Sequence, residues 1–217
     1  TLVTGGLERL THEFQHADAV WKLTHAQPSY FGHIQVLDLF DASGEHSTRA
    51  LLNDGMTQNQ FDPSGNSSAL YPYVLERVGL SAARNPQKAF VLGIAAGVVP
   101  MGYARAGLQV HAVDINKKMI EVTRRYLGFQ PELMEVTIED ARAAARRCDG
   151  GYDIVAVDLF RDDGMPEHLV TREFFADLEN CLKEGGVLVM NSFTSVDYMA
   201  SQHALVKTVA SVFGEPV

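Results

Sequence analysis

Cysteine is scarce in this chain, and the two cysteines are far apart in the sequence. Cys148 and Cys181 match no metal-binding or redox spacing, and two cysteines cannot form a disulfide framework. The sequence has no CxxC or HExxH motif, and its eight histidines are scattered, so it indicates no metal site. Sparse cysteine fits a reducing compartment, and we therefore expect a cytoplasmic protein.

Positive charge and long apolar runs are also in short supply. The 18 lysines and arginines face 27 aspartates and glutamates, for a net charge of −9. This balance disfavours a nucleic-acid partner or an anionic membrane surface, and it is compatible with a cationic substrate. The 16-residue uncharged run 89–104 is too short to span a bilayer and contains Pro100 and three glycines.

The most informative segment that is present covers residues 88–114. The continuous apolar run 89–94 predicts a parallel strand covered on both faces. Gly93 and Gly97 carry no side chain, so the backbone there can approach a ligand closely. Asp114 follows Gly93 by 21 positions and ends a second strand, where a carboxylate can bind both ribose hydroxyls. The segment predicts a nucleoside site, with a βαβ unit that binds nothing as the alternative.

The chain is predicted to divide into a small N-terminal β-hairpin domain over residues 1–70 and an α/β domain over residues 71–217. In the first part, a strand over 30–39 precedes an Asn-Asp-Gly turn at 53–55. Beyond it, a helix over 70–78, a connector over 79–87 and then alternating strands and helices predict a Rossmann-like, doubly wound parallel sheet. The strands are expected near 89–94, 108–113, 133–138, 152–157 and 186–191, and the helices near 98–106, 116–126, 140–147, 171–183 and 196–212.

Acidic residues follow three of the predicted strands. Asp114, the pair Glu139-Asp140 and Asp158 would meet at one edge of the sheet, where such folds bind ligands. This arrangement fits an adenosine site with Asp114 on the ribose and with Asp140 and Ala141 beside the adenine. Asp158 would then face the reacting end. The alternatives are that Asp140 only caps the following helix and that Asp158 is a loop acid without a chemical role.

Short motifs stand in a fixed order over residues 29–193. They are SYFGHIQV, LNDGMTQ, YPYVL, VLGIAAG, HAVDIN, YDIVAVDLF, DGMPEHLVTREFF and LKEGGVLVMN. Through these motifs the chain resembles the spermidine synthases, or polyamine aminopropyltransferases, and most of all their divergent bacterial spermidine-synthase-like relatives. The resemblance implies a small N-terminal β domain on a methyltransferase-like Rossmann domain.

The resemblance also implies a chemistry from polyamine biosynthesis. The donor would be decarboxylated S-adenosylmethionine, whose aminopropyl group passes to a small-molecule amine. Free amines have a pKa near ~10, so a carboxylate must take the proton. By resemblance Asp158 is that base, Tyr71 contacts the substrate and Gln58 contacts the donor, while Asp114 and Asp140 bind ribose and adenine.

Some positions depart from the family pattern and keep other functions open. Val98 replaces the acid that holds the donor's terminal ammonium, and Arg161 stands where a second acid is expected. Asp162 or Asp163 would compensate only with a rearranged loop. The alternatives are a methyltransferase that uses S-adenosylmethionine itself and a non-catalytic module that binds a nucleoside. The acceptor and the oligomeric state, a homodimer among the choices, are left open.

Overall fold

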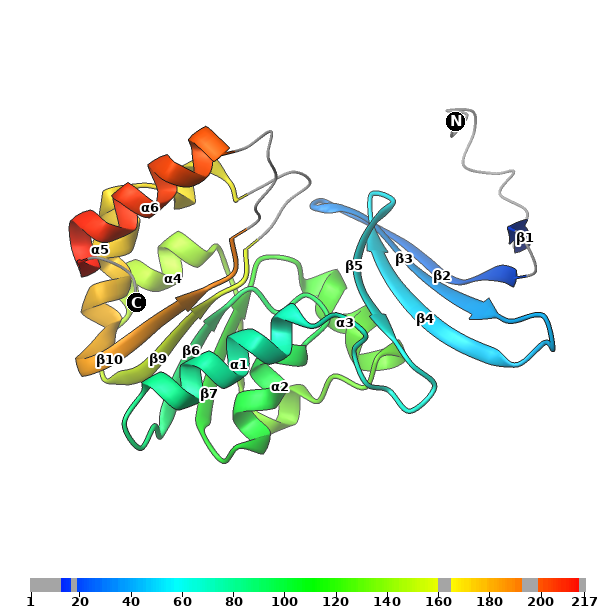
Figure 1. The fold of residues 1–217 in the computed structure, drawn as a ribbon, viewed down its shortest axis with the longest axis horizontal. Coiled ribbons are helices and arrows are strands. Elements are labelled where there is room, and N and C mark those ends of the chain that lie inside the picture. Colours follow the sequence, from blue (N-terminus) through cyan, green and yellow to red (C-terminus); the bar gives the residue numbers. More distant parts are fainter. Residues whose placement is uncertain (1–12, 17–18, 160–164, 193–198, 215–217) are drawn as a thin grey trace. The chain divides into compact units, whose positions relative to one another are not determined.

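The structure is a computed structural model that describes residues 13–16, 19–159, 165–192 and 199–214. The chain divides into two compact units, Thr1–Ala69 and Leu70–Val217. Each unit is built on its own five-stranded sheet (Figure 1).

The N-terminal unit is an antiparallel sheet in which sequential strands are neighbours. The expected strand over 30–39 begins only at Gly32, because Tyr30 and Phe31 form the turn before it. The tight turn at Asp54 and Gly55 is confirmed, with φ values of 49° and 79° that suit a two-residue hairpin. The strands are β1 (Glu13–His16), β2 (Ala19–Ser29), β3 (Gly32–Phe40), β4 (His46–Asn53) and β5 (Met56–Phe61).

The C-terminal unit contains the predicted parallel sheet, with strand order β10-β9-β6-β7-β8. All four neighbouring pairs are parallel, so their carboxyl ends lie at one edge. The last strand begins at Leu182, four residues before the expected start. The strands are β6 (Lys88–Leu92), β7 (Gln109–Asp114), β8 (Glu135–Ile138), β9 (Tyr152–Val157) and β10 (Leu182–Met190).

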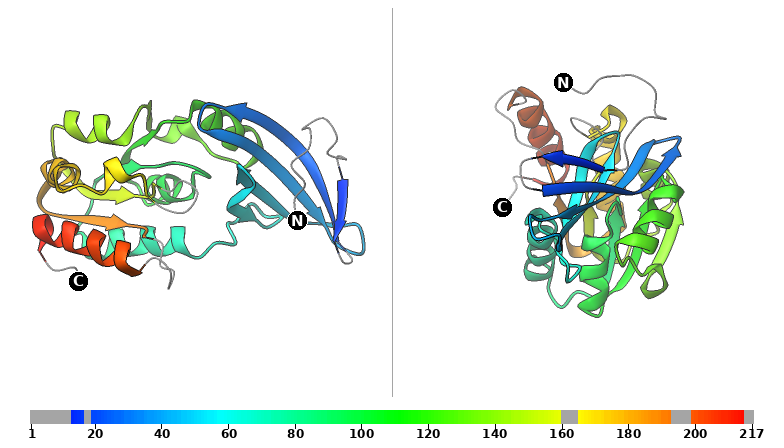
Figure 2. Two further views of the ribbon diagram at one scale, coloured as in Figure 1. Left: turned by 90° about the horizontal axis from the view of Figure 1, so that it is seen from above. Right: turned by 90° about the vertical axis from the view of Figure 1, so that its right-hand side faces the viewer.

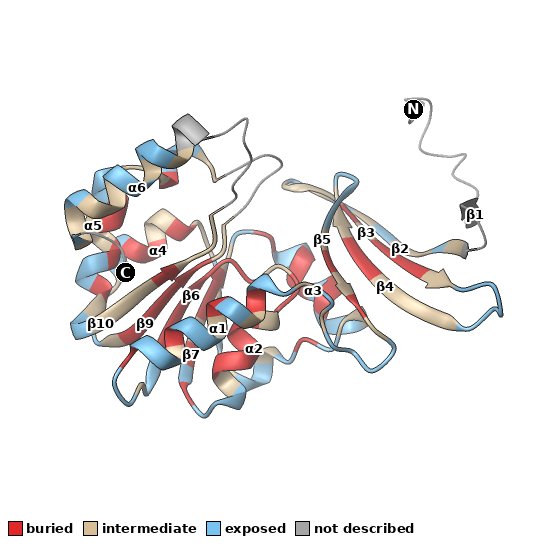
Figure 3. Ribbon diagram, viewed as in Figure 1, coloured by how far each residue is buried: buried red, intermediate tan, exposed pale blue. Residues whose placement is uncertain are grey.

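Helices cover both faces of this sheet, as Figures 1 and 2 show. Alternating strand residues supply two cores: Val91 faces α1, α2 and α3, whereas Phe90 faces α4, α5 and α6. The central strands are therefore buried on both sides (Figure 3), which confirms the doubly wound α/β fold. The helices are α1 (Tyr71–Ala82), α2 (Val98–Arg105), α3 (Lys117–Tyr126), α4 (Ala141–Arg147), α5 (Arg172–Cys181) and α6 (Met199–Phe213), with short 3-10 turns η2 (Pro131–Leu133) and η3 (Glu167–Leu169).

Helix α1 runs through the segment 79–82 that was expected to be a connector. Gly79 weakens the helical signal in the sequence, because glycine is a poor helix former. In the structure Gly79 is buried against Tyr103, whose hydroxyl donates to the carbonyl of Leu75 at 3.1 Å. Tertiary packing therefore keeps this turn helical. Within the described residues, no helix is long and apolar enough to cross a membrane.

We predict that Gly79→Ala lowers the free energy of unfolding by about 1–3 kcal/mol, the usual cost of overpacking a core. A Cβ there would lie 2.4 Å from the hydroxyl oxygen of the fully buried Tyr103. Gly102→Ala is the matched control, because its Cβ would meet the flexible, partly exposed side chain of Glu76, which can move aside. Urea unfolding of both variants is the measurement, and equal midpoints would contradict the packing argument.

Candidate functional site

The candidate site begins at the carboxyl edge of the parallel sheet. Hydrogen bonding between the strands continues one residue past their ends. The amide of Asp158 donates to Leu92 O at 2.9 Å, and the amide of Asn191 donates to Val157 O at 2.9 Å. Residues just beyond β6, β9 and β10 are therefore held in register as firmly as the strands themselves.

The loop after β6 needs glycine at two positions for the packing of the protein itself, and the predicted close approach of a ligand there stays a prediction. Gly93 has a φ of +94°, and a Cβ on it would lie 2.1 Å from the carbonyl oxygen of Asp158. Gly97 has a φ of +79°, and its Cβ would lie 2.3 Å from the ring of Phe129. The space that these glycines leave is filled by protein atoms, so they first permit the packing of the site's own walls.

Asp114 lies at the end of β7, and its carboxylate organises that loop. Its Oδ2 accepts hydrogen bonds from the amides of Ile94 at 2.9 Å and Ala95 at 3.2 Å. Its Oδ1 accepts one from the amide of Asn116 at 2.8 Å. Burial raises the pKa of Asp114, while these three bonds act in the opposite direction. A carboxylate has about four acceptor positions, so roughly one stays available, which is fewer than the predicted contact with both ribose hydroxyls would use.

Asp140 is the N-cap of α4, as expected from the sequence. The other role considered for it is a contact with adenine. Asp140 Oδ1 accepts hydrogen bonds from the amides of Arg142 at 3.0 Å and Ala143 at 3.1 Å. Its Oδ2 lies 3.4 Å from Nε2 of His168. Ala141, the first residue of α4, is buried. A contact between this helix start and adenine stays a prediction.

Asp158 and Tyr71 are far apart in sequence and in contact in the structure. The Tyr71 hydroxyl lies close enough to the Asp158 carboxylate to interact with it, and Asn191 Nδ2 donates to Asp158 Oδ1 at 3.0 Å. Burial raises the pKa of Asp158, although both neighbours lower it. Burial and the neighbouring Asp158 charge raise the pKa of Tyr71, so its hydroxyl stays protonated.

Sequence reasoning did not single out Asn191. The signal for it was a polar residue directly after the apolar run at 187–190, at the end of a predicted parallel strand. The three residues Tyr71, Asp158 and Asn191 come from α1, β9 and β10, and we call them the Asp158 cluster.

The remaining residues named from the sequence belong to other parts of the chain. Gln58 lies on β5 in the N-terminal unit, where its amide donates to a backbone oxygen of the same strand at 3.3 Å. Val98 is the half-buried first residue of α2. Arg161, Asp162 and Asp163 lie outside the described residues.

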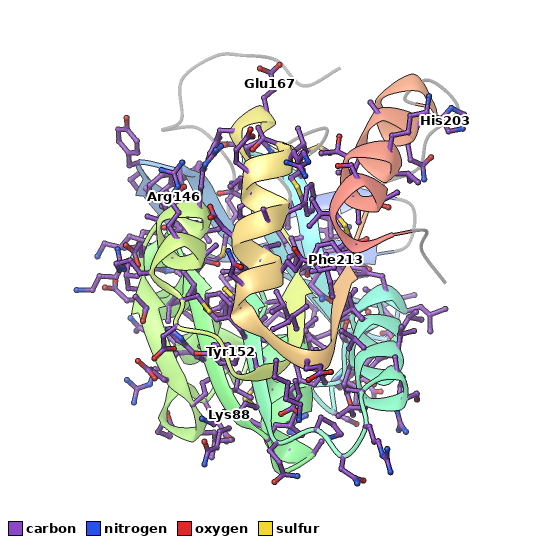
Figure 4. The ribbon with its side chains drawn as sticks, turned by 90° about the vertical axis from the view of Figure 1, so that its left-hand side faces the viewer. Lys88, Arg146, Tyr152, Glu167, His203 and Phe213 are labelled. Atoms are coloured by element: carbon purple, nitrogen blue, oxygen red, sulfur yellow. The ribbon has the colours of Figure 1, made fainter. Side chains whose placement is uncertain are left out.

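A separate hollow of about 370 Å³ lies at the amino edge of the same sheet. Its lining includes Lys88 and Tyr152, which begin β6 and β9 and are labelled in Figure 4. Because ligands of such sheets bind at the carboxyl edge, the hollow is not the candidate site. The described residues contain no group of three or more His, Cys, Asp or Glu side chains arranged to hold a metal.

Comparison with known proteins identifies the family. A spermine/spermidine synthase domain matches residues 69–215. The chain belongs to the spermine/spermidine synthase family. It is 33% identical over 152 residues to a polyamine aminopropyltransferase of Vibrio vulnificus, which covers 67% of this chain and 50% of the relative. It is 29% identical over 205 residues to a probable polyamine aminopropyl transferase of Bifidobacterium longum, covering 90% of this chain and 44% of the relative. The chain thus spans about half the length of these two relatives.

Solved structures show the same fold. A spermidine synthase in complex with the transition-state analogue AdoDATO has a TM-score of 0.75 at 19% identity, over 95% of this chain and 75% of that one. A spermidine synthase from Thermotoga maritima has a TM-score of 0.72 at 19% identity, over 97% and 74%. Human methyltransferase-like protein 13, in complex with SAH, has a TM-score of 0.59 at 24% identity, over 67% and 73%. The methyltransferase-like architecture expected from the resemblance is therefore confirmed.

We predict that Asp114→Ala weakens the binding of methylthioadenosine by roughly 1–3 kcal/mol, because a charged hydrogen-bond partner is lost. Calorimetry on the folded variant measures the affinity. Asp149→Ala is the matched control, since Asp149 lines the hollow at the opposite edge and should leave the affinity unchanged. An Asp114→Ala variant that is folded and binds as well as the wild type would contradict the ribose assignment.

Proposed function

We propose that this protein transfers an aminopropyl group from decarboxylated S-adenosylmethionine to an amine. The observation that carries the proposal is the contact between Asp158 and Tyr71 at the carboxyl edge of the sheet. It supports the proposal because the same edge holds the loop after β6, where the sequence predicts a nucleoside, and because family membership makes this chemistry the first to test. The relatives named polyamine aminopropyltransferases lend further support.

For this reaction the protein must position the amine against the donor and accept one proton. The lone pair of the amine nitrogen forms a bond to the carbon next to the donor sulfur. The bond between that carbon and the sulfur breaks, and methylthioadenosine leaves as a neutral thioether. The proton released from the amine passes to Asp158, whose burial makes it a stronger base than an exposed aspartate.

Val98 favours methyl transfer from intact S-adenosylmethionine as a second candidate function. A buried ammonium needs a paired carboxylate, because an unpaired charge in an apolar setting is costly. Val98 offers an apolar side chain where the family resemblance implies that acid. If Val98 lines the donor tail, decarboxylated S-adenosylmethionine should show little advantage over the intact molecule.

The donor prediction is tested by competition between the two forms. We expect the wild-type preference for the decarboxylated form to be under a hundredfold, or about 2.7 kcal/mol. Val98→Asp should raise that preference, because a new carboxylate attracts the terminal ammonium and repels the carboxylate of the intact donor. Val74→Asp, at an exposed position on α1, is the control. A wild-type preference above a hundredfold would show that another acid binds the ammonium, with Asp162 and Asp163 the first to examine.

Asp158→Asn should retain methylthioadenosine binding and lose most turnover, because an amide cannot take the proton. Loss of a general base costs about 10²–10⁴ in rate. The pKa of Asp158 is raised by burial, so wild-type activity should fall as the pH drops through a value above the usual ~3.9, where the carboxylate becomes protonated.

Turnover is measured with putrescine, spermidine and cadaverine, and Asp149→Asn serves as the control. Turnover of Asp158→Asn within a factor of about three of the wild type would exclude Asp158 as the base, given the losses typical of a missing base. Absence of transfer to any of these amines by the wild type would contradict the proposed function itself.

A further inference from the structure

We infer that Asn191 is a positioning residue that orients the Asp158 carboxylate for proton transfer. The mechanistic part of this inference rests on the proposed function. Its structural part, the coupling between the two side chains, stands on the geometry of the sheet and can be tested without any turnover.

The register of the two strands brings the side chains together. In the parallel pair β9–β10, Met190 lies opposite Val157, so Asn191 follows opposite Asp158. The hydrogen bond from the amide of Asn191 to Val157 O, at 2.9 Å, carries this register past the strand ends. A shift of one residue in β10 would turn the carboxamide to the other face of the sheet.

Alternation along the strands also decides which face the pair occupies. Val157 and Met190 pack in the core beneath α4, α5 and α6. Asp158 and Asn191, one residue further on, therefore point toward the face covered by α1. Tyr71 is the first residue of α1, which explains how its hydroxyl reaches the same carboxylate.

The hydrogen bond from Asn191 restricts the rotation of the Asp158 carboxylate. Asn191 Nδ2 donates to Oδ1 of Asp158 at 3.0 Å, while the Tyr71 hydroxyl contacts the same group from α1. Two donors from different elements limit rotation about the carboxylate bond. Neither donor uses all of the lone pairs, so the group can still accept a proton from a substrate.

Asn191 carries no charge, and this affects the pKa of Asp158. A lysine or arginine at this position would depress the pKa of Asp158 strongly and make it a poor base. A carboxylate there would compete for the proton. Among the described residues, the groups that shift the pKa of Asp158 are Asn191 and Tyr71, and Tyr71 is the titratable one. The amide therefore orients the base with only a modest loss of basicity.

Two substitutions test the inference by the pH profile of turnover. Asn191→Ala should reduce kcat tenfold or more, with the donor KM within a factor of about three, and move the acid limb to higher pH because a donor to the carboxylate is lost. Asn191→Asp keeps the shape but places a second carboxylate beside the first. The pair would share a proton, so the acid limb should move further than in Asn191→Ala.

The matched control is Asn180→Ala, at an exposed position on α5, which should leave kcat and the pH profile unchanged. Methylthioadenosine affinity close to that of the wild type shows that each variant is folded. A purely structural role for Asn191 would change stability but not the acid limb. An Asn191→Ala enzyme with wild-type kcat and acid limb would overturn the inference.

Carbon-13 NMR of the aspartate carboxyl groups separates this inference from the proposed function. Without substrate, the pKa of Asp158 should be measurably higher in Asn191→Ala than in the wild type, because the carboxylate has lost a donor. Identical titration curves would overturn the coupling whether or not transfer occurs. The expected shift in a protein that transfers nothing would uphold the coupling and contradict the proposed function alone.

Discussion

The parallel register of β6, β7, β9 and β10 is the constraint on which the rest of the C-terminal unit depends. Four strands that run the same way end at one edge, so the residues after each strand lie beside the residues after its neighbours. The central strands β6 and β9 are buried on both faces, and none of the four strands can slip by one residue without turning its apolar side chains to the other face of the sheet. Core packing thereby fixes the positions of Asp114, Asp158 and Asn191.

The two half-buried aspartates of this edge, Asp114 and Asp158, have partners of different kinds. Three backbone amides surround Asp114, which is therefore tied to the shape of the loop after β6. Two side chains, those of Tyr71 and Asn191, contact Asp158. Burial raises the pKa of both aspartates, and only Asp158 has the side-chain partners on which the proposed role as a base rests. Asp114 is thus bound by backbone amides, whereas Asp158 is contacted by side chains.

Gly93 and Gly97 are required by packing within the protein. Both were expected to let a ligand approach the backbone, which stays a prediction, and both have a positive φ in the loop after β6. The atoms that a side chain would meet there are the carbonyl of Asp158 and the ring of Phe129. Gly93 thus connects the loop after β6 to the Asp158 cluster through backbone packing, a relation between residues 65 positions apart in the chain.

The sequence by itself determined the alternation of strands and helices, the acids that follow the strands and the family, because these depend on local periodicity and on short motifs. It did not determine the helical state of residues 79–82, which depends on contact with Tyr103. Nor did it reveal that Tyr71 and Asn191 bind the same carboxylate. That meeting joins α1, β9 and β10, and only strand order and register, which are set by long-range packing, bring the three residues together.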